Sequence, residues 1–196
     1  MFWLARQTLK ERILLLTGRP GVGKTSVMTR FVELMKSAGY AVGGMVSREV
    51  RQGSNRVGFE IVDLASGRKG WLARVSQQSG PRVGKYWVDI QNLEGIGVEA
   101  ILDAVKDSDV IAIDEIGPME LKSEKFKNAV SKAAEGSKLL IAVVHWKAGE
   151  DTIDKIKARD DVKLYDVTAE NRGDIHLTIC KEASAFLSGF SGKKGS

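Results

Sequence analysis

The chain has 196 residues, of which 43% are hydrophobic and 28% are charged. This length allows one core that buries about 70% of the unfolded surface, and the composition is far from that of disordered chains. Cys180 is the only cysteine, which excludes an internal disulfide and argues against a catalytic thiol. The apolar start at residues 2–4 is too short for a signal peptide or a membrane span, so we expect a cytoplasmic protein.

The formal net charge is +5, with 30 Lys and Arg against 25 Asp and Glu. Because the two signs are interspersed along most of the sequence, the charge favours a mixed solvated surface with a phosphate site over a nucleic-acid-binding surface. No aromatic-rich RNA-binding signature is apparent. RNA or another macromolecular partner is therefore left open without support, as is the oligomeric state.

The first elements in chain order are a strand, a glycine-rich loop and a helix. The short apolar run at residues 12–17 is typical of a buried parallel strand. Apolar residues then recur at helical spacing over residues 24–38, and Gly39 is suited to ending that helix. This is the order in which a phosphate-binding loop is built.

Further along, residues 42–90 consist of short β-rich pieces separated by Gly, Ser and Asn, including 57–64 and 85–90, which we interpret as hairpins attached to the main sheet. After them, helical and strand patterns alternate, which predicts a mostly parallel sheet between helices, an α/β P-loop NTPase fold. We expect one domain over residues 1–190, with 42–90 as a β-rich insertion and 191–196 as a flexible tail. The expected helices are 98–106, 122–135, 151–158 and 174–187, and the expected strands are 110–113, 139–144 and 162–167.

The glycine-rich loop has the complete spacing of the Walker A motif between a predicted strand and a predicted helix. Its glycines let backbone N–H groups surround phosphate oxygens at the start of the helix. Lys24 is expected to reach the β- and γ-phosphates, and the Thr25 hydroxyl is expected to bind Mg²⁺. The nucleotide-binding residues predicted here are Gly18, Arg19, Pro20, Gly21, Val22, Gly23, Lys24 and Thr25.

Two adjacent carboxylates, Asp114 and Glu115, end the apolar strand at residues 110–113. Ligands of open α/β sheets lie beyond the carboxyl ends of the strands, so Asp114 is expected beside the loop as a magnesium ligand, directly or through water. Glu115 is then placed to orient or deprotonate an attacking water. The competing interpretation is that both acids only cap the next segment, or that Glu115 is an exposed loop charge.

Polar residues also follow the next two predicted strands. His145 is a candidate sensor of the γ-phosphate, although a histidine at a strand end is more often a hydrogen-bonded surface residue. Trp146 is a candidate for stacking on a base, with packing as the competing role. Asn171 and Arg172 are candidates to flank the base or ribose, with a helix N-cap as the competing role. One of five basic residues in the β-rich segment could act as a finger on the phosphates, and the sequence does not choose among Arg48, Arg51, Arg56, Arg82 and Lys85.

Taken together, these segments resemble the THEP-type nucleoside triphosphatases. The resemblance covers most of the chain and includes, besides the glycine-rich loop, residues 47–51, 56–59, 80–86, 113–121 and 167–172. It implies hydrolysis of several nucleoside triphosphates to the diphosphate and phosphate with weak base preference. It also assigns phosphate binding to the loop, and the magnesium and water-activating roles to Asp114 and Glu115.

Two other functions fit the same motif. A P-loop kinase would pass the γ-phosphate to a small molecule or a nucleic-acid end, and residues 42–90 could supply its acceptor pocket and lid. An RNA-associated nucleotide switch would bind the nucleotide and turn it over slowly. A hydrolase is favoured because the pair Asp114 and Glu115 suits water activation.

Overall fold

The computed structural model describes residues 11–145 and 151–191. The buried strand β1 (Ile13–Thr17) leads through the glycine-rich loop into helix α1 (Lys24–Ser37). Just beyond the end of α1, Gly39 has a φ of 90°, a left-handed conformation that glycine adopts without strain. The predicted order of strand, loop and helix is confirmed.

Within the described residues, nine strands form one sheet in the order β5-β6-β4-β3-β2-β7-β8-β1-β9. The parallel part runs from β2 (Val42–Gln52) through β7 (Val110–Ile116), β8 (Leu139–Val144) and β1 to β9 (Val162–Asp166). The other strands are antiparallel: β3 (Asn55–Asp63), β4 (Lys69–Arg74), β5 (Arg82–Val83) and β6 (Tyr86–Val88).

Strand β2 belongs to both parts of the sheet. Residues 42–46 pair in parallel with β7, and residues 45–52 pair antiparallel with β3. The β-rich segment is therefore a direct extension of the parallel sheet, which β2 joins without a break. Its first five residues lie inside the parallel part, where the sequence interpretation placed only hairpins.

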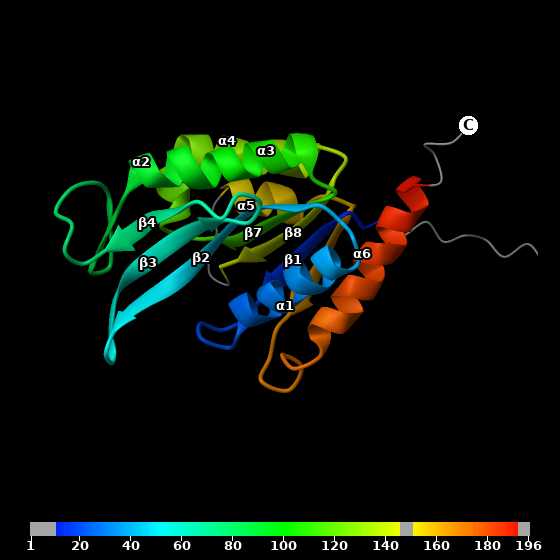
Figure 1. The fold of residues 1–196 in the computed structure, drawn as a ribbon, viewed down its shortest axis with the longest axis horizontal. Helices are drawn as coiled ribbons and strands as arrows, with labels where there is room; N and C mark the ends of the chain where they lie inside the picture. The colour runs from blue at the N-terminus through cyan, green and yellow to red at the C-terminus, as the bar shows by residue number, and fades with distance from the viewer. Residues whose placement is uncertain (1–10, 146–150, 192–196) are drawn as a thin grey trace, which may run out of the picture.

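Helices cover both faces of the parallel strands (Figure 1). On one face lie α3 (Glu99–Asp107), α4 (Glu124–Glu135) and α5 (Asp151–Lys157), and on the other lie α1 and α6 (Ile175–Ser191). In β1, Ile13 and Leu15 pack in the first core, and Leu14 and Leu16 pack in the second. Burial on both faces explains the continuous apolar run of this strand. The predicted α/β fold class is confirmed.

The region before β7 differs from the prediction. The expected strand at 85–90 ends at Val88, and a helical stretch begins at Ile90 and continues to Asp107 through α2 (Ile90–Asn92) and a π-helical segment, Leu93–Val98. Asp89 starts it, because its carboxylate accepts a hydrogen bond from Asn92 N at 3.0 Å. The two glycines within Leu93–Val98 hid this part of the helix in the sequence.

Four of the later elements follow the prediction closely, whereas β7 and α6 end three and four residues beyond their expected bounds. α4, β8, α5 and β9 lie within two residues of their expected bounds, and Ser123 caps α4 by accepting from Phe126 N at 3.2 Å. Cys180 is partly buried on α6, and burial raises its pKa to about 11. Of the predicted tail at 191–196, all but Ser191 lies outside the described residues. Among the described helices, none is both long and apolar enough to cross a membrane.

Candidate active site

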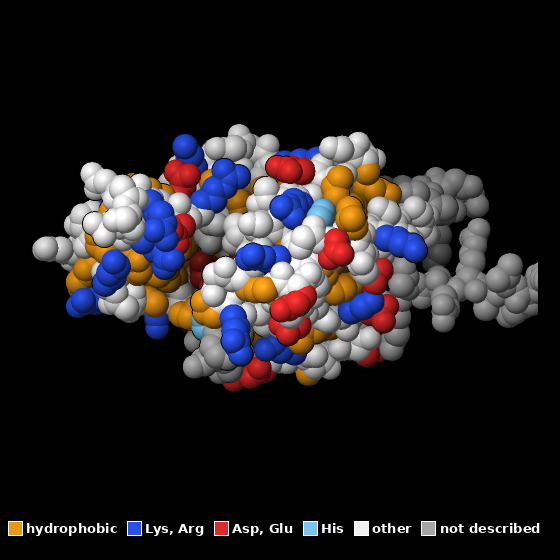
Figure 2. Space-filling model, turned by 90° about the horizontal axis from the view of Figure 1, so that it is seen from below, with side chains coloured by type: hydrophobic (Ala, Val, Ile, Leu, Met, Phe, Trp, Pro, Cys, Tyr) orange, Lys and Arg blue, Asp and Glu red, His pale blue; other side chains and the backbone are white. Residues whose placement is uncertain are grey.

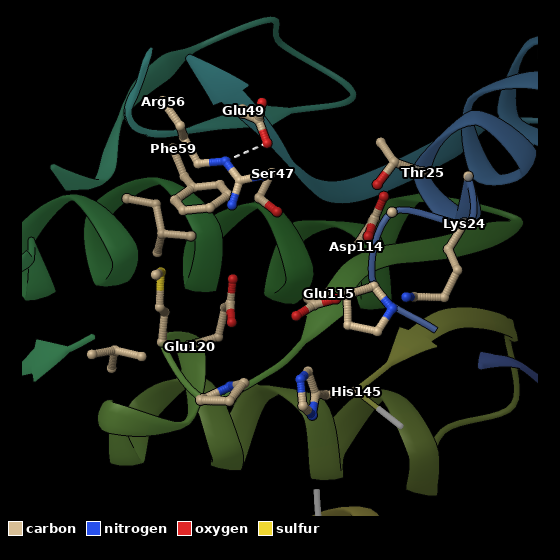
Figure 3. Close-up of a pocket in the computed structure, with 17 residues that line it drawn as sticks. Lys24, Thr25, Ser47, Glu49, Arg56, Phe59, Asp114, Glu115, Glu120 and His145 are labelled. Atoms are coloured by element: carbon tan, nitrogen blue, oxygen red, sulfur yellow. Dashed lines mark ion pairs between the residues drawn. The ribbon is translucent and has the colours of Figure 1, made fainter. Parts of the chain in front are cut away.

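A pocket of about 510 Å³ lies at the carboxyl ends of β7, β8 and β1, which follow one another in the sheet. One end is formed by the glycine-rich loop, through Pro20, Gly21, Gly23, Lys24 and Thr25. Figure 3 shows Lys24, Thr25 and Asp114 at this end, and Arg56, Phe59 and Glu49 at the other. The predicted edge of the sheet therefore carries the pocket, and the β extension provides its far wall.

The glycine-rich loop depends on backbone that only glycine adopts easily. Gly18, Gly21 and Gly23 have φ values of 144°, 76° and 110°. A Cβ on Gly18 would also lie 2.4 Å from the carbonyl oxygen of Val167, so the loop is packed directly against the end of β9. Of the predicted loop residues, Gly18, Arg19 and Val22 do not line the pocket.

Lys24 is held by the loop that it follows. Its Nζ donates to the carbonyl oxygens of Gly18 at 3.0 Å and Arg19 at 3.3 Å. The ammonium group thus lies above the loop without a carboxylate partner among the described residues. A cation in this place can bind phosphate oxygens that the loop amides also surround.

Asp114 is buried beside the first turn of α1, with 2% of its surface exposed. Its carboxylate accepts a hydrogen bond from Thr25, while Oδ2 is buried with no hydrogen-bond partner. Burial raises the pKa of Asp114 to about 7; the Thr25 bond and nearby Lys24 act against this rise, whereas Glu115 adds to it. The structure therefore brings together the two residues predicted to hold a metal.

Glu115 is partly buried and lines the same pocket. In Figure 3 it lies between the Lys24 end and Glu120. Its side chain also folds against Gly117, where an added Cβ would lie 2.5 Å from Glu115 Oε1. Gly117 thus leaves the space that this conformation of Glu115 requires.

The sequence interpretation missed Glu120, which lines the pocket together with Asp114, Glu115 and Glu49. It is 3% exposed and follows the turn at Pro118, and its carboxylate accepts from the backbone amides of Gly117 and of Glu120 itself. Burial, together with the charges of Glu115 and Asp114, raises the pKa of Glu120 to about 8. The turn that returns the chain to the pocket was its only signal in the sequence.

Of the five basic residues considered as fingers, Arg56 alone lines this pocket. It forms an ion pair with Glu49, which also pairs with Arg51, and its guanidinium carbon lies 5.4 Å from the centroid of the Phe59 ring. Arg56 and Lys24 are therefore the two cations of the pocket lining, at opposite ends of it.

Of the two candidates that follow β8, the structure describes only His145. His145, at the end of β8, lines the pocket, and its backbone N donates to Ile116 O at 3.3 Å. Trp146 lies outside the described residues. The prediction that His145 senses the γ-phosphate stays a prediction.

Asn171 and Arg172 lie on the loop after β9, outside the pocket lining. The Asn171 side chain accepts from Thr168 N at 2.9 Å and donates to Asp166 O at 2.8 Å, so it fixes the loop itself. Arg172 Nη1 donates to Val22 O at 3.3 Å. This contact brings Arg172 onto the outer side of the phosphate loop.

The oxygen groups at the start of α1 suit a magnesium ion. The unpartnered Oδ2 of Asp114 and the Thr25 hydroxyl are hard oxygen ligands of the kind Mg²⁺ prefers. Within residues 11–145 and 151–191, no group of three or more His, Cys, Asp or Glu could hold a metal alone. An ion here would take its other ligands from phosphate oxygens and water, as is usual for Mg²⁺.

A parallel sheet between helices, a Walker A loop after β1 and a buried carboxylate on β7, two strands along the sheet, define a P-loop NTPase. A family model described as NTPase matches residues 13–180. The nucleoside-triphosphatase THEP1 of Thermofilum pendens is 48% identical over 174 residues, which cover 88% of this chain and 96% of the relative. That of Methanothermobacter thermautotrophicus is 44% identical, over 85% of this chain and 92% of the relative.

Solved structures agree with these sequence matches. The solution structure of a human cancer-related nucleoside triphosphatase superposes with a TM-score of 0.74 at 35% identity, and covers 87% of this chain and 96% of its own. The crystal structure of THEP1 from Aquifex aeolicus gives 0.74 at 30% identity, over 85% and 96% of the two chains. The chain therefore belongs to the THEP1-type nucleoside-triphosphatase family, as its resemblance indicated, and the predicted enzyme class is confirmed.

Proposed function

We propose that the chain hydrolyses ATP, GTP and other nucleoside triphosphates to the diphosphate and phosphate, in a magnesium-dependent reaction with weak base selectivity, in the cytoplasm. The observation that carries this proposal is the single pocket in which Lys24 and Thr25 at one end adjoin Asp114 and Glu115. These are the groups that phosphoryl transfer to water requires: a phosphate-binding cation, a metal site and a carboxylate next to the γ-phosphate position.

In this reaction the oxygen of a water attacks the γ-phosphorus as the bond to the β–γ bridging oxygen breaks, and the nucleoside diphosphate leaves. Lys24 binds the β- and γ-phosphates together with the loop amides. Glu115 orients the water and accepts its proton. Support for this role comes from the place of Glu115 in the lining, between the loop and the far wall (Figure 3).

Thr25 and Asp114 would hold Mg²⁺, Thr25 through its hydroxyl and Asp114 directly or through water. When bound, the ion neutralises negative charge on the β- and γ-phosphate oxygens. The Thr25–Asp114 hydrogen bond keeps both oxygen groups together before nucleotide arrives. We assign Asn171 and Arg172 to the nucleoside side of the loop, because Arg172 contacts Val22. Weak base selectivity is supported by Asn171, whose amide is already bonded to its own loop.

The apolar far wall favours a second candidate, a kinase. Beyond Glu115 the pocket is lined by five apolar residues, a larger surface than a single water needs, so it could hold a phosphate acceptor. These residues are Phe59, Leu72, Val83, Pro118 and Met119. In that reaction an acceptor hydroxyl replaces water as the nucleophile, and Glu115 takes the hydroxyl proton.

Phosphate release should be measured with ATP, GTP, CTP and UTP, with Mg²⁺ or with EDTA, and with Lys24→Ala as the inactive control. The proposal predicts that the rates of phosphate release from all four nucleotides lie within about tenfold of one another. Weak base selectivity means that the interaction free energies of the four bases differ by less than about 1.4 kcal/mol. EDTA and Lys24→Ala should each abolish phosphate release. Release that needs a small alcohol, and a phosphorylated alcohol as product, would instead establish the kinase.

A further inference from the structure

The outer side of the β extension carries a row of paired residues across five strands. Neighbouring strands place Arg82 opposite Trp87, Trp87 opposite Arg74, Arg74 opposite Gly58, and Gly58 opposite Val50. Residues directly opposite in antiparallel strands lie on the same face of the sheet. The neighbours Val83, Tyr86 and Phe59 therefore point to the other face, where Val83 and Phe59 line the active-site pocket.

A second row lies beside the first. In the strand register Arg48 lies opposite Glu60, and Glu60 lies opposite Trp71. Trp71 reaches over Gly58, where an added Cβ would lie 2.9 Å from the Trp71 ring, so the two rows form one surface. We call this surface the outer face and define it by Arg48, Gly58, Trp71, Arg74, Arg82 and Trp87.

On the outer face each tryptophan is stacked by an arginine. The guanidinium carbon of Arg74 lies 5.7 Å from the Trp71 ring centroid, and that of Arg82 lies 5.6 Å from the Trp87 ring centroid. Such pairs stabilise the fold only slightly when exposed. They also present flat cationic groups on which the bases of nucleic acids stack.

The arginines of this face lack carboxylate partners. Arg48, Arg74 and Arg82 form no ion pair within the described part of the chain, whereas Arg51 and Arg56 pair with Glu49 and Arg68 pairs with Glu99. The carboxylate on this side of the sheet, Glu60, forms an ion pair with Lys69 at 3.7 Å, so the three arginines are in excess of the acidic groups beside them. Their charge is available to an anionic ligand.

The β-rich segment that carries the outer face has an excess of basic residues. Residues 42–90 contain eight Lys and Arg against four Asp and Glu, a surplus of four positive charges. Figure 2 views the molecule from the side of α1 and α6, and shows Lys and Arg grouped around hydrophobic side chains at the end that carries the β extension. The outer face therefore lies on a segment with more basic than acidic residues.

We propose that the outer face binds single-stranded nucleic acid. Arg48, Arg74 and Arg82 contact phosphates, and bases stack on Trp71 and Trp87 with their guanidinium partners. A sheet face that combines basic and aromatic side chains suits unstacked bases, because bases within a duplex cannot reach the rings. The face lies on the opposite side of the extension from Phe59 and Val83, so the strand and the nucleotide do not compete for the same surface.

The test is the binding of a fluorescein-labelled 20-nucleotide oligouridine to the full chain by fluorescence anisotropy, at 50 and 200 mM salt. Trp87→Ala should weaken binding about fivefold or more, as loss of one stacked base does. Arg74→Gln should weaken binding at low salt and lower the dependence on salt concentration, since it removes one phosphate contact. Lys132→Gln, an exposed lysine on α4 at the other face of the sheet, is the matched control and should bind as the parent does.

Phosphate release from ATP should be unchanged in all three variants, which establishes that each is folded with an intact active site. A DNA strand of equal length shows whether the sugar is read. The proposal is overturned if the parent does not bind oligouridine at 50 mM salt, if Arg74→Gln and Trp87→Ala both bind as the parent does, or if duplex RNA binds as tightly as the single strand. Binding to phosphatidylserine vesicles in place of oligouridine would assign the face to a membrane surface and also overturn it.

Discussion

At the scale of single residues, Asp114 has the surroundings expected of a metal ligand. It is 2% exposed, bonded to Thr25, and has one oxygen without a partner. Asp114→Asn keeps the shape but removes the charge, so we expect a magnesium requirement several-fold higher, with nucleotide binding by the loop amides partly retained.

This prediction is checked by titrating Mg²⁺ in the phosphate-release assay for the variant and the parent. Glu135→Gln, an exposed carboxylate change on α4, is the control for any general effect of lost charge. If both variants show the magnesium dependence of the parent, Asp114 has no part in holding the metal.

Glu120 links the site to the pH dependence of stability. Its pKa rises from 4.5 in the unfolded chain to about 8 in the folded one, chiefly through burial. Between these values the folded state binds more protons than the unfolded state, so Glu120 makes stability decrease as pH rises from about 4.5 to about 8. Outside this window its contribution is constant.

Glu120→Gln cannot ionise, so we expect the decrease in stability of the metal-free protein between pH 6 and 9 to be smaller than in the parent by more than about 1 kcal/mol. Chemical denaturation at a series of pH values measures this difference. Parallel curves for variant and parent would mean that Glu120 ionises in the folded protein as it does in the unfolded chain.

At the scale of elements, the fit of β2 against β7 depends on Gly44. Its φ is 107°, and an added Cβ would lie 2.1 Å from the carbonyl oxygen of Ala112. Gly53, in the turn between β2 and β3, also has a positive φ of 60° but has nothing within 4 Å of an added Cβ. Substitution of Gly53 therefore tests backbone strain alone, whereas substitution of Gly44 tests backbone strain together with a steric clash.

We expect Gly53→Ala to cost about 1–2 kcal/mol of unfolding free energy, the cost of left-handed backbone in a residue with a Cβ. Gly44→Ala should cost more than about 2 kcal/mol, because the clash with β7 adds to that strain. Chemical denaturation of the two variants compares them directly. Equal losses would show that β2 moves away from β7 at no cost.

Sequence patterns predicted the elements that are regular and local. β1, β8 and α4 each have one uninterrupted apolar pattern, and their bounds were found within two residues. The parallel half of β2 was not recognised because Gly43 and Gly44 interrupt its apolar pattern. The glycines are there because Ala104 and Ser108 approach Gly43, and Ala112 approaches Gly44. Such contacts are tertiary and leave no periodic signal.

At the scale of the whole molecule, the site also contains residues that the sequence predicted and residues that it did not. The loop and Asp114 were predicted because each belongs to a motif of consecutive residues. Arg56 was not assigned because the pairing of β2 with β3 brings it to the pocket, and Glu120 was missed because the short turn after β7 returns it there. The outer face was not predicted for a related reason, since its arginines and tryptophans come together only through the register of the strands.

The account as a whole rests on one claim, that this pocket hydrolyses nucleoside triphosphates with Glu115 acting on the attacking water. The most direct test compares Glu115→Gln with the parent in steady-state phosphate release and in equilibrium binding of a non-hydrolysable ATP analogue. A positioned general base is worth about 10²- to 10⁴-fold in rate, or about 3–5 kcal/mol of barrier. We predict a loss of that size in release, with binding changed by less than about threefold. Release within about threefold of the parent would contradict the claim.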